Sequence, residues 1–441
     1  MCYIKNMKKI VPFFVCCLFV FSGCGKIKDQ VQDNKEKKMR RNSVEIYNAL
    51  NSEQKKKKSA FEKYVSSVSL HDKVCQLFIE NLEGDTIFVP VEKDFVPGGY
   101  LFFGYNLADS PAGIIKFTDS IKKYCAKNGI IPPFLAIDQE GGLVNRLKIV
   151  NGPLHSAEKI ASRADIDSAY KIYSAQAEQM KNLGFDMNIA PVVEVKTAGN
   201  EHFLNGRSFG DFQKVKEFGT ACVNAYENHG IGTVVKHFPG NTNTDPHSGL
   251  PEILLSGTEL EESLKPFFEI NRCAPAGALM SHARVKSVDG EIPACFSRHW
   301  VSEILRGEIG FEGIVFSDDI FMGALALNGF PPEEAAVRAL EAGVNVIMVS
   351  EKRISGPAKV LISKAEKDSD FEKLIDNSFR KVMEYKIRQN LVSFEKDENG
   401  NYSVVPVLKK ESVAARVEKF NKARKENIDI YIEKIDYGEK N

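Results

Sequence analysis

The 441-residue sequence has no net charge, no apolar run of transmembrane length and no CxxC pair of cysteines. The lack of long apolar runs excludes a polytopic membrane protein. The nine cysteines include no CxxC spacing, which argues against a disulfide framework or a zinc site. Metal-binding signatures of the HxH and HExxH type are also missing. What remains is an ordinary content of apolar (43%) and charged (27%) residues, which excludes a disordered or collagen-like chain and indicates a globular protein.

The absence of net charge conceals an uneven distribution of charges along the chain. Residues 1–24 carry three lysines and no acid, and residues 25–60 carry eleven basic and five acidic residues. Residues 393–441 hold ten of each sign, so residues 61–392 have a net charge of −9. A basic N-terminal segment therefore precedes an acidic body. Because the basic residues do not form a helix face with interleaved aromatics, we expect no nucleic-acid partner.

The N-terminal segment is typical of a targeting signal. Lys8 and Lys9 precede a twelve-residue apolar run, Ile10–Phe21, which is too short to span a bilayer and matches the apolar core of a signal peptide. The sequence FSGCG that follows resembles the lipidation motif of bacterial lipoproteins, with Phe21 in place of the usual leucine and Cys24 as the lipidated residue. The alternative is an ordinary secretory signal with an incidental cysteine.

We therefore predict a lipoprotein signal peptide at residues 1–23 and a polar, lysine-rich tether at residues 24–60. This arrangement implies a protein of the cell envelope that is held to a membrane through its lipid anchor. The lysines at 55–58 either contact anionic lipid headgroups or belong to a solvated spacer.

The body of the chain alternates between short β-rich runs and helical stretches. The Gly residues at 184 and 343 come directly before such runs, as glycines that end helices do. Repeated strand–helix units imply a parallel sheet. We predict an α/β fold, a single (β/α)8 TIM-type barrel at residues 61–392, with a doubly wound open sheet as the alternative. The seven predicted strands, which leave one strand of the barrel unassigned, lie at 100–106, 134–138, 186–191, 233–238, 277–282, 313–319 and 344–350.

The C-terminal residues 393–441 are too few for a second catalytic domain. Val413, Val417, Phe420 and Ala423 recur at helical spacing, which predicts a helix near Val413–Ile435. We interpret this charged segment as an appendage that packs on the barrel.

Polar residues follow the apolar part of nearly every predicted strand. A barrel gathers the C-terminal ends of its strands around one mouth, where active sites lie. The convergence of carboxylates, histidines and a lysine at these ends predicts a polar catalytic cavity. The strand-end residues are Asp138, Asn188, Lys236, His237, His282 and Asp318.

Four segments together resemble glycoside hydrolase family 3, in the β-N-acetylglucosaminidase branch that acts on peptidoglycan fragments. The resemblance covers roughly residues 70–391, with the segments in the family's order and spacing. The segments are IDQEGGLVNRL (137–147), NIAPVVEV with GRSFG (188–195 and 206–210), VVKHFPGNTNTDPHSGLP (234–251) and GFEGIVFSDDIFMGAL (310–325).

The resemblance implies a retaining mechanism with a covalent glycosyl-enzyme intermediate. Asp318 would be the nucleophile, and His247, oriented by Asp245, would be the acid/base. An imidazole with a pKa near 6.5 suits the donation and later removal of a proton near neutral pH. Because neighbouring side chains on a strand point to opposite faces, we expect Asp319 to be structural rather than catalytic.

The resemblance also implies a set of residues that bind sugar hydroxyls: Asp138, Arg146, Arg207, Lys236 and His237. For Arg146 and Arg207 the alternative is a structural ion pair with an acid such as Glu140 or Glu194. For the adjacent pair Lys236 and His237 to face one substrate, the strand end must be irregular. We expect His282 to shape the pocket without a catalytic role.

The implied substrate is a glycan with a terminal β-linked GlcNAc, and the implied chemistry needs no metal or organic cofactor. Three alternatives stay open. The chain could be a β-glucosidase of the same family, or a catalytically weakened glycan-binding lipoprotein, because its loop before Asp245 is shorter than the family pattern. It could also be a metal-dependent hydrolase with His237, Asp245, His247 and His282 as ligands.

Overall fold

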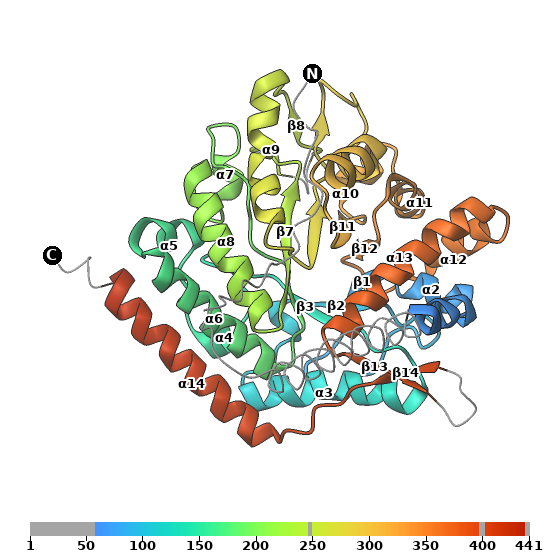
Figure 1. Ribbon diagram of the computed structural model, residues 1–441, viewed down its shortest axis with the longest axis horizontal. Helices are drawn as coiled ribbons and strands as arrows, with labels where there is room; N and C mark the ends of the chain where they lie inside the picture. The colour runs from blue at the N-terminus through green and yellow to red at the C-terminus, as the bar shows by residue number, and fades with distance from the viewer. Residues whose placement is uncertain (1–57, 246–248, 397–401, 437–441) are drawn as a thin grey trace, which may run out of the picture. The chain divides into compact units, whose positions relative to one another are not determined.

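The computed structural model describes residues 58–245, 249–396 and 402–436 of the 441-residue chain (Figure 1). The chain divides into two units, Met1–Glu62 and Lys63–Asn441, and the account below concerns the second. The predicted signal peptide, Cys24 and nearly all of the tether lie outside the described residues, as does His247. In the described part of the chain, none of the helices has the length and apolarity that a membrane span requires.

Eight parallel strands close into a barrel, which confirms the predicted (β/α)8 architecture. Hydrogen bonds connect them in the order β1-β12-β11-β9-β7-β6-β3-β2, so β1 and β2 close the ring. The strands are β1 (Phe78–Asn81), β2 (Gly99–Phe102), β3 (Phe134–Ile137), β6 (Met187–Asn188), β7 (Gly232–Phe238), β9 (Gly277–Met280), β11 (Ile314–Asp319) and β12 (Val346–Val349).

The strand left unassigned by the sequence is β1, whose four residues are all buried. Most of the other strands are shorter than predicted, and β6 keeps only two residues of the run at 186–191. Because β-rich composition continues into the loops beyond a strand, the composition alone overestimates strand length. The barrel core consists of buried side chains, including Phe78, Phe102 and Phe316.

Helices surround the strands, as Figure 1 shows. Asp165 caps the N-terminus of helix α6, because its side chain accepts a hydrogen bond from the Ser168 amide. The helix ends at Gly184, which has a φ of 103°. Gly343 ends α11 in the same way, with a φ of 112°. The prediction that both glycines end helices is thus confirmed, because a residue with a Cβ is strained at these angles.

The helices and the remaining small sheets have the following bounds. The larger helices are α2 (Leu70–Cys75), α3 (Pro111–Asn128), α5 (Ala157–Arg163), α6 (Ile166–Leu183), α8 (Phe212–Asn228), α9 (Gly257–Asn271), α11 (Pro332–Ala342), α12 (Ser355–Ala365), α13 (Ser369–Arg388) and α14 (Val413–Tyr431). A π-helix spans His299–Glu308, and the short helices are α4 (Lys148–Asn151), α7 (Glu201–Leu204) and α10 (Gly323–Leu327). The small sheets are β4 (Gln139–Gly141) with β5 (Val144–Asn145), β8 (Glu252–Ile253) with β10 (Arg284–Val285), and β13 (Val392–Lys396) with β14 (Tyr402–Pro406).

The C-terminal segment packs on the barrel's outer helices. Helix α14 runs along α6, which Figure 1 shows in red beside green, and also contacts α3. Phe420 and Ala423 are buried as predicted, but the buried face also includes Arg416 and Tyr431 and leaves Val417 only half-buried. The Arg416 guanidinium is buried because Asp119 Oδ1 (2.7 Å) and the Asn182 carbonyl (2.9 Å) accept its hydrogen bonds. The β13–β14 hairpin before α14 was not predicted.

Candidate active site

A cavity of about 390 Å³ lies at the C-terminal ends of the barrel strands. Six of the predicted site residues line it, although they come from four separate segments of the sequence. These residues are Asp138, Arg146, Arg207, Lys236, His237 and Asp318. Asp245, in the loop after β7, is exposed and does not line this cavity. His247 lies outside the described residues, so its predicted pairing with Asp245 stays a prediction.

Lys236 connects two carboxylates at the cavity wall. Its Nζ lies 2.7 Å from Asp138 Oδ1 and 2.7 Å from Glu140 Oε1. Glu140 also accepts two hydrogen bonds from Arg207, at 2.8 Å from Nε and 2.9 Å from Nη2. The side chains of Lys236 and Glu140 are only 4% and 3% exposed, so solvent screens these charges weakly. The alternating charges hold every member of the cluster in one position.

The alternative for Arg207, an ion pair with Glu140, is therefore confirmed. Arg207 also lines the cavity, and its contact with sugar hydroxyls stays a prediction. Arg146 is less constrained, since its Nη2 lies 4.0 Å from Asp138 Oδ2. Each guanidinium also lies over an aromatic ring, Arg146 over Phe103 and Arg207 over Phe203, at 5.3 Å from the ring centroid in both cases. These contacts fix the two cations at the mouth.

The charge cluster keeps Glu140 ionised. Burial by itself would raise the pKa of this carboxyl, but the charges of Lys236 and Arg207 outweigh burial and lower the pKa to about 2. Burial likewise acts to lower the pKa of Arg207, and the Glu140 carboxylate reverses the effect and raises it. Glu140 was considered only as an ion-pair partner at the sequence level. Its position two residues after Asp138, in the same motif, could have indicated that it belongs to the site.

His237 is oriented by a buried glutamate. Its Nδ1 lies 2.6 Å from Glu194 Oε1, and the other Glu194 oxygen accepts from the Asn241 amide at 2.6 Å. Because an ionised carboxylate only accepts hydrogen bonds, Nδ1 carries the proton, and Nε2 is the ring's remaining polar atom for the cavity. The peptide bond between Lys236 and His237 is cis, and the register of β7 against β9 shifts between Lys236 and Phe238. The predicted irregularity at this strand end is thus confirmed.

The two aspartates that end β11 both border the cavity, so the prediction that strand alternation would turn Asp319 away was wrong. The pairing of β11 with β12 shifts register between Phe316 and Asp319, and this irregularity breaks the strict alternation. The carboxylates differ in their partners. Asp319 Oδ1 accepts from the amides of Phe321 (3.0 Å) and Ser350 (2.9 Å), which supports a structural role. Burial raises the pKa of Asp319, although these hydrogen bonds oppose the rise.

His282 supports this strand end from behind. It is buried, its Nε2 lies 2.9 Å from the Asp319 carbonyl oxygen, and its Nδ1 lies 3.1 Å from Cys295 Sγ. Since His282 does not line the cavity, it shapes the site indirectly, as predicted. Asn188 is also structural. Its Oδ1 accepts a hydrogen bond from the Gln139 amide, and its Nδ2 donates one to the Gln139 carbonyl.

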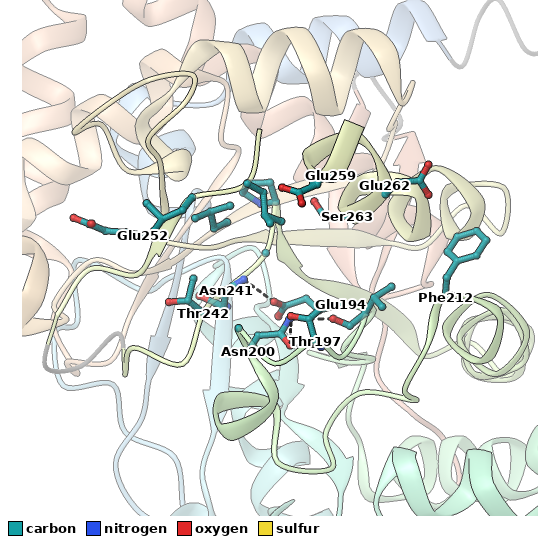
Figure 2. A pocket seen from close by; sticks show the side chains of 17 residues that line it. Glu194, Thr197, Asn200, Phe212, Asn241, Thr242, Glu252, Glu259, Glu262 and Ser263 are labelled. Atoms are coloured by element: carbon teal, nitrogen blue, oxygen red, sulfur yellow. Dashed lines mark hydrogen bonds between the residues drawn. The ribbon is translucent and has the colours of Figure 1, made fainter. Parts of the chain in front are cut away.

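A second cavity, of about 580 Å³, lies on the other side of Glu194 (Figure 2). Figure 2 shows the Glu194 carboxylate at its wall with the hydrogen bond from Asn241, while Glu259, Glu262 and Ser263 come from α9. Glu194 thus belongs to one cavity and orients a histidine of the other. No residue of this second cavity had been predicted to bind substrate, although Glu194 and Asn241 belong to the motifs at 188–195 and 234–251.

In the described residues, no group of three or more His, Cys, Asp or Glu side chains is arranged to hold a metal ion. Two residues of the metal-site alternative, His237 and His282, instead bond Glu194 and the Asp319 backbone.

The amino-acid sequence of this chain is similar to those of known glycosyl hydrolases. Residues 69–385 match the model of the glycosyl hydrolase family 3 N-terminal domain. Beta-hexosaminidase A of Pseudoalteromonas piscicida is 30% identical over 274 residues, which are 57% of this chain and 45% of that protein. The beta-hexosaminidase of Tolumonas auensis is 32% identical over 272 residues, which are 59% of this chain and 78% of that protein.

Solved structures of the same family share this fold, and one of them serves as an example. The family 3 beta-N-acetylglucosaminidase of a Paenibacillus species superposes with a TM-score of 0.66 at 27% identity, over 81% of this chain and 69% of that chain. The chain therefore spans less than half of the Pseudoalteromonas protein and most of the other two.

Proposed function

Because this chain belongs to glycosyl hydrolase family 3, we propose that it is a retaining exo-β-N-acetylglucosaminidase that acts on peptidoglycan-derived or related glycans. One observation supports the mechanism above all: Asp318 borders the same cavity as the cation-bridged acids Asp138 and Glu140. The similarity to proteins named beta-hexosaminidases supports the choice of a GlcNAc unit as the cleaved sugar.

In the first step, the Asp318 carboxylate attacks the anomeric carbon of the terminal sugar. The bond from that carbon to the glycosidic oxygen breaks, and the protonated His247 gives its proton to the departing oxygen. The product is a glycosyl ester on Asp318. The Asp319 amide donates to Asp318 Oδ1 at 2.9 Å, which positions the attacking group at the strand end.

In the second step, water hydrolyses the glycosyl ester. His247, now neutral, removes a proton from the water while the oxygen attacks the anomeric carbon, and the Asp318 carboxylate leaves. Two inversions give net retention of configuration. Asp245 stabilises the imidazolium that forms in each turnover, as an orienting carboxylate does in a triad.

The remaining cavity residues hold the sugar. Asp138 and the Nε2 atom of His237 accept hydrogen bonds from hydroxyl groups, and Lys236 and the two arginines Arg146 and Arg207 donate to them. Because Lys236 and Glu140 are bonded before the substrate arrives, little rotamer entropy is lost on binding.

The substrate class is tested by comparing nitrophenyl β-GlcNAc with nitrophenyl β-glucoside, with His247→Ala beside wild type. We expect kcat/KM to favour the GlcNAc substrate by at least about 10²-fold, because a site that bonds a substrate group discriminates against analogues lacking it. For His247→Ala, kcat/KM should fall about 10²-fold or more on GlcNAc-β-1,4-GlcNAc but less than about tenfold on the nitrophenyl glycoside, whose leaving group needs no proton.

Two results would count against this assignment. A preference for the glucoside would identify a β-glucosidase instead. Equal losses of kcat/KM on both leaving groups in His247→Ala would show that His247 is not the acid, and the discrimination between sugars would still be interpretable.

We further propose that Cys24 is lipidated and that residues 1–23 are removed as a signal peptide, which places the enzyme at a membrane of the cell envelope. The motif FSGCG supports this proposal. In Cys24→Ser, the mature protein should partition into the soluble fraction and lack the lipid mass in mass spectrometry, while its activity on the nitrophenyl glycoside stays unchanged. Membrane association that persists in this variant would contradict lipidation as the anchor.

A further inference from the structure

A third cavity, of about 540 Å³, lies at the opposite end of the barrel from the active site. It is lined by residues that come just before the N-terminal ends of two strands, Phe185 and Asp186 before β6 and Gly230 before β7. The active-site cavity lies at the C-terminal ends of the strands. We call this space the floor cavity.

The floor cavity is lined by five cations and one carboxylate. The cations are Lys122, Lys181, Arg388, Lys409 and Lys410, and the carboxylate is Asp186. Asp186 accepts from Lys122 Nζ at 2.9 Å and also from the Leu135 amide at 2.9 Å, so it neutralises one of the five. Within the described part of the chain, no ion pair joins the other four to a carboxylate, although the half-buried Glu227 lies close enough for the charge of Arg388 to act on its pKa.

Lys409 illustrates the cost of this arrangement. Its Nζ donates to the Lys181 carbonyl at 2.7 Å, and the residue is exposed, as are the other three cations without a carboxylate partner. The surrounding protein and the like charge of Lys122 lower the pKa of Lys409 to about 8, and Asp186 opposes the change. Like charges that are gathered without counterions destabilise a fold unless an anion binds among them.

The rest of the wall is partly apolar, and it also includes Gln389 and Asn390. Phe185, Leu391, Val407 and Leu408 line the same space. A volume of about 540 Å³ is within the range of small-molecule sites and exceeds what one inorganic phosphate needs. The cavity therefore offers both charge for an anionic group and a surface for an organic part.

Much of the lining comes from outside the family domain. The family match ends at residue 385, whereas Arg388 to Leu391 and Val407 to Lys410 follow it. The unpredicted strands β13 and β14 lie between these two segments in the chain.

We propose that the floor cavity binds a phosphate-bearing organic molecule, with Lys181, Arg388, Lys409 and Lys410 contacting the phosphate oxygens and the apolar wall contacting the organic part. The phosphate group could belong to a soluble ester or to the headgroup of an anionic phospholipid. The site is separate from the proposed catalysis, so its test does not depend on the identity of the sugar substrate.

The test uses the full chain without its signal peptide and measures binding of glycerol 3-phosphate by calorimetry, with uncharged glycerol as the control ligand. In parallel, the protein is sedimented with vesicles of phosphatidylglycerol or of phosphatidylcholine. We expect saturable binding that weakens as salt is raised. Binding of glycerol 3-phosphate identifies a soluble ester, whereas binding of phosphatidylglycerol vesicles alone identifies a headgroup, and either result supports the proposal.

The variants separate this cavity from general surface charge. The double variant Lys181→Met/Lys409→Met should weaken binding at least about tenfold. If that variant does not fold, the single change Lys410→Met, at another exposed lysine of the cavity, should weaken binding to a similar extent. The matched control, Lys422→Met/Lys425→Met, removes two exposed lysines of α14 and should bind as wild type does. Turnover of the nitrophenyl glycoside should be unchanged in all of them.

The proposal is overturned if neither phosphate ester nor vesicle binds at low salt. It is also overturned if the control weakens binding as much as the cavity variants, or if glycerol 3-phosphate inhibits hydrolysis competitively with an inhibition constant equal to its Kd, since the anion would then occupy the active site.

Discussion

Replacing Asp318 by alanine is expected to lower kcat/KM for nitrophenyl β-GlcNAc by at least about 10⁴-fold, because the loss of a catalytic nucleophile removes the covalent route altogether. Asp318 follows the buried residues of β11 and borders the cavity that contains the predicted sugar-binding residues. No neighbouring carboxylate can replace it. Asp138 and Glu140 are bonded to Lys236, and Asp319 accepts from two backbone amides.

The role of Asp318 can be distinguished from a general loss of activity by adding azide. In Asp318→Ala the anion should attack the anomeric carbon from the face that the carboxylate occupied, giving the α-glycosyl azide in one inversion. In His247→Ala azide should instead attack the glycosyl-enzyme from the opposite face and give the β-glycosyl azide. Nuclear magnetic resonance of the two products therefore assigns nucleophile and acid/base independently.

Asp319→Asn is the matched control for Asp318→Ala. It keeps the side-chain shape, and its amide oxygen can still accept from the amides of Phe321 and Ser350. We expect this variant to lose stability but to retain activity that azide does not change. Full turnover by Asp318→Ala, or α-azide formation by Asp319→Asn, would falsify the assignment of the nucleophile.

Replacing Lys236 by methionine is expected to lower the free energy of unfolding by about 3–5 kcal/mol at neutral pH, because a buried ion pair that loses one partner leaves uncompensated charge. Asp138 and Glu140 would both lose the ammonium that lies 2.7 Å from each. Activity should also fall by about 10²-fold or more, since charged hydrogen bonds to the sugar are lost. Urea unfolding and kcat/KM measure the two effects.

The deficit in stability should depend on pH in a defined direction. In the wild type, burial of Glu140 is outweighed by Lys236 and Arg207, and its pKa is about 2. This depressed pKa contributes stability above the unfolded value of about 4.5, and the contribution is lost as the pH falls from there toward 2. Without Lys236 the pKa of Glu140 rises, so acidification neutralises the buried charge and the difference between variant and wild type should shrink.

Two further variants separate stability from catalysis. Lys236→Met/Glu140→Gln removes both charges and should recover stability at neutral pH without recovering activity. Lys73→Met is a control for stability alone. It removes a buried ammonium group that lies 2.8 Å from Asp376, and Lys73 does not line the active-site cavity. It should lose stability and keep kcat/KM. An unchanged unfolding free energy in Lys236→Met would contradict the bridging role.

Much of the fold could be predicted because its signals are local. Seven apolar runs with polar ends identified seven of the eight strands, and Gly184 and Gly343 identified two helix ends. Strand β1 was missed because only the first two of its four residues, FIEN, are apolar, so it does not form an apolar run. It becomes a strand by pairing with β2 and β12, which no local signal reveals.

The active site was predictable to the same extent. Six residues at strand ends and in nearby loops were identified from their motifs, and they line one cavity. The position of Asp319 was predicted wrongly, because ideal alternation does not anticipate the register shift between Phe316 and Asp319. Such a shift depends on how β12 packs beside β11, and that is decided by the whole barrel.

The amino-acid sequence by itself determined the family, the strand–helix alternation and the chemical character of the site, because periodicity and short motifs depend on residues close together in the chain. Only the tertiary structure decided which charges face one another. Lys236 and Asp138 are 98 residues apart in sequence and 2.7 Å apart in space. Likewise, Lys122 and Lys409 come together in the floor cavity only because the C-terminal segment folds back beneath the barrel. Electrostatic interaction falls off with distance in space, not along the chain, so the sequence lists the charges and the closed barrel determines their energies.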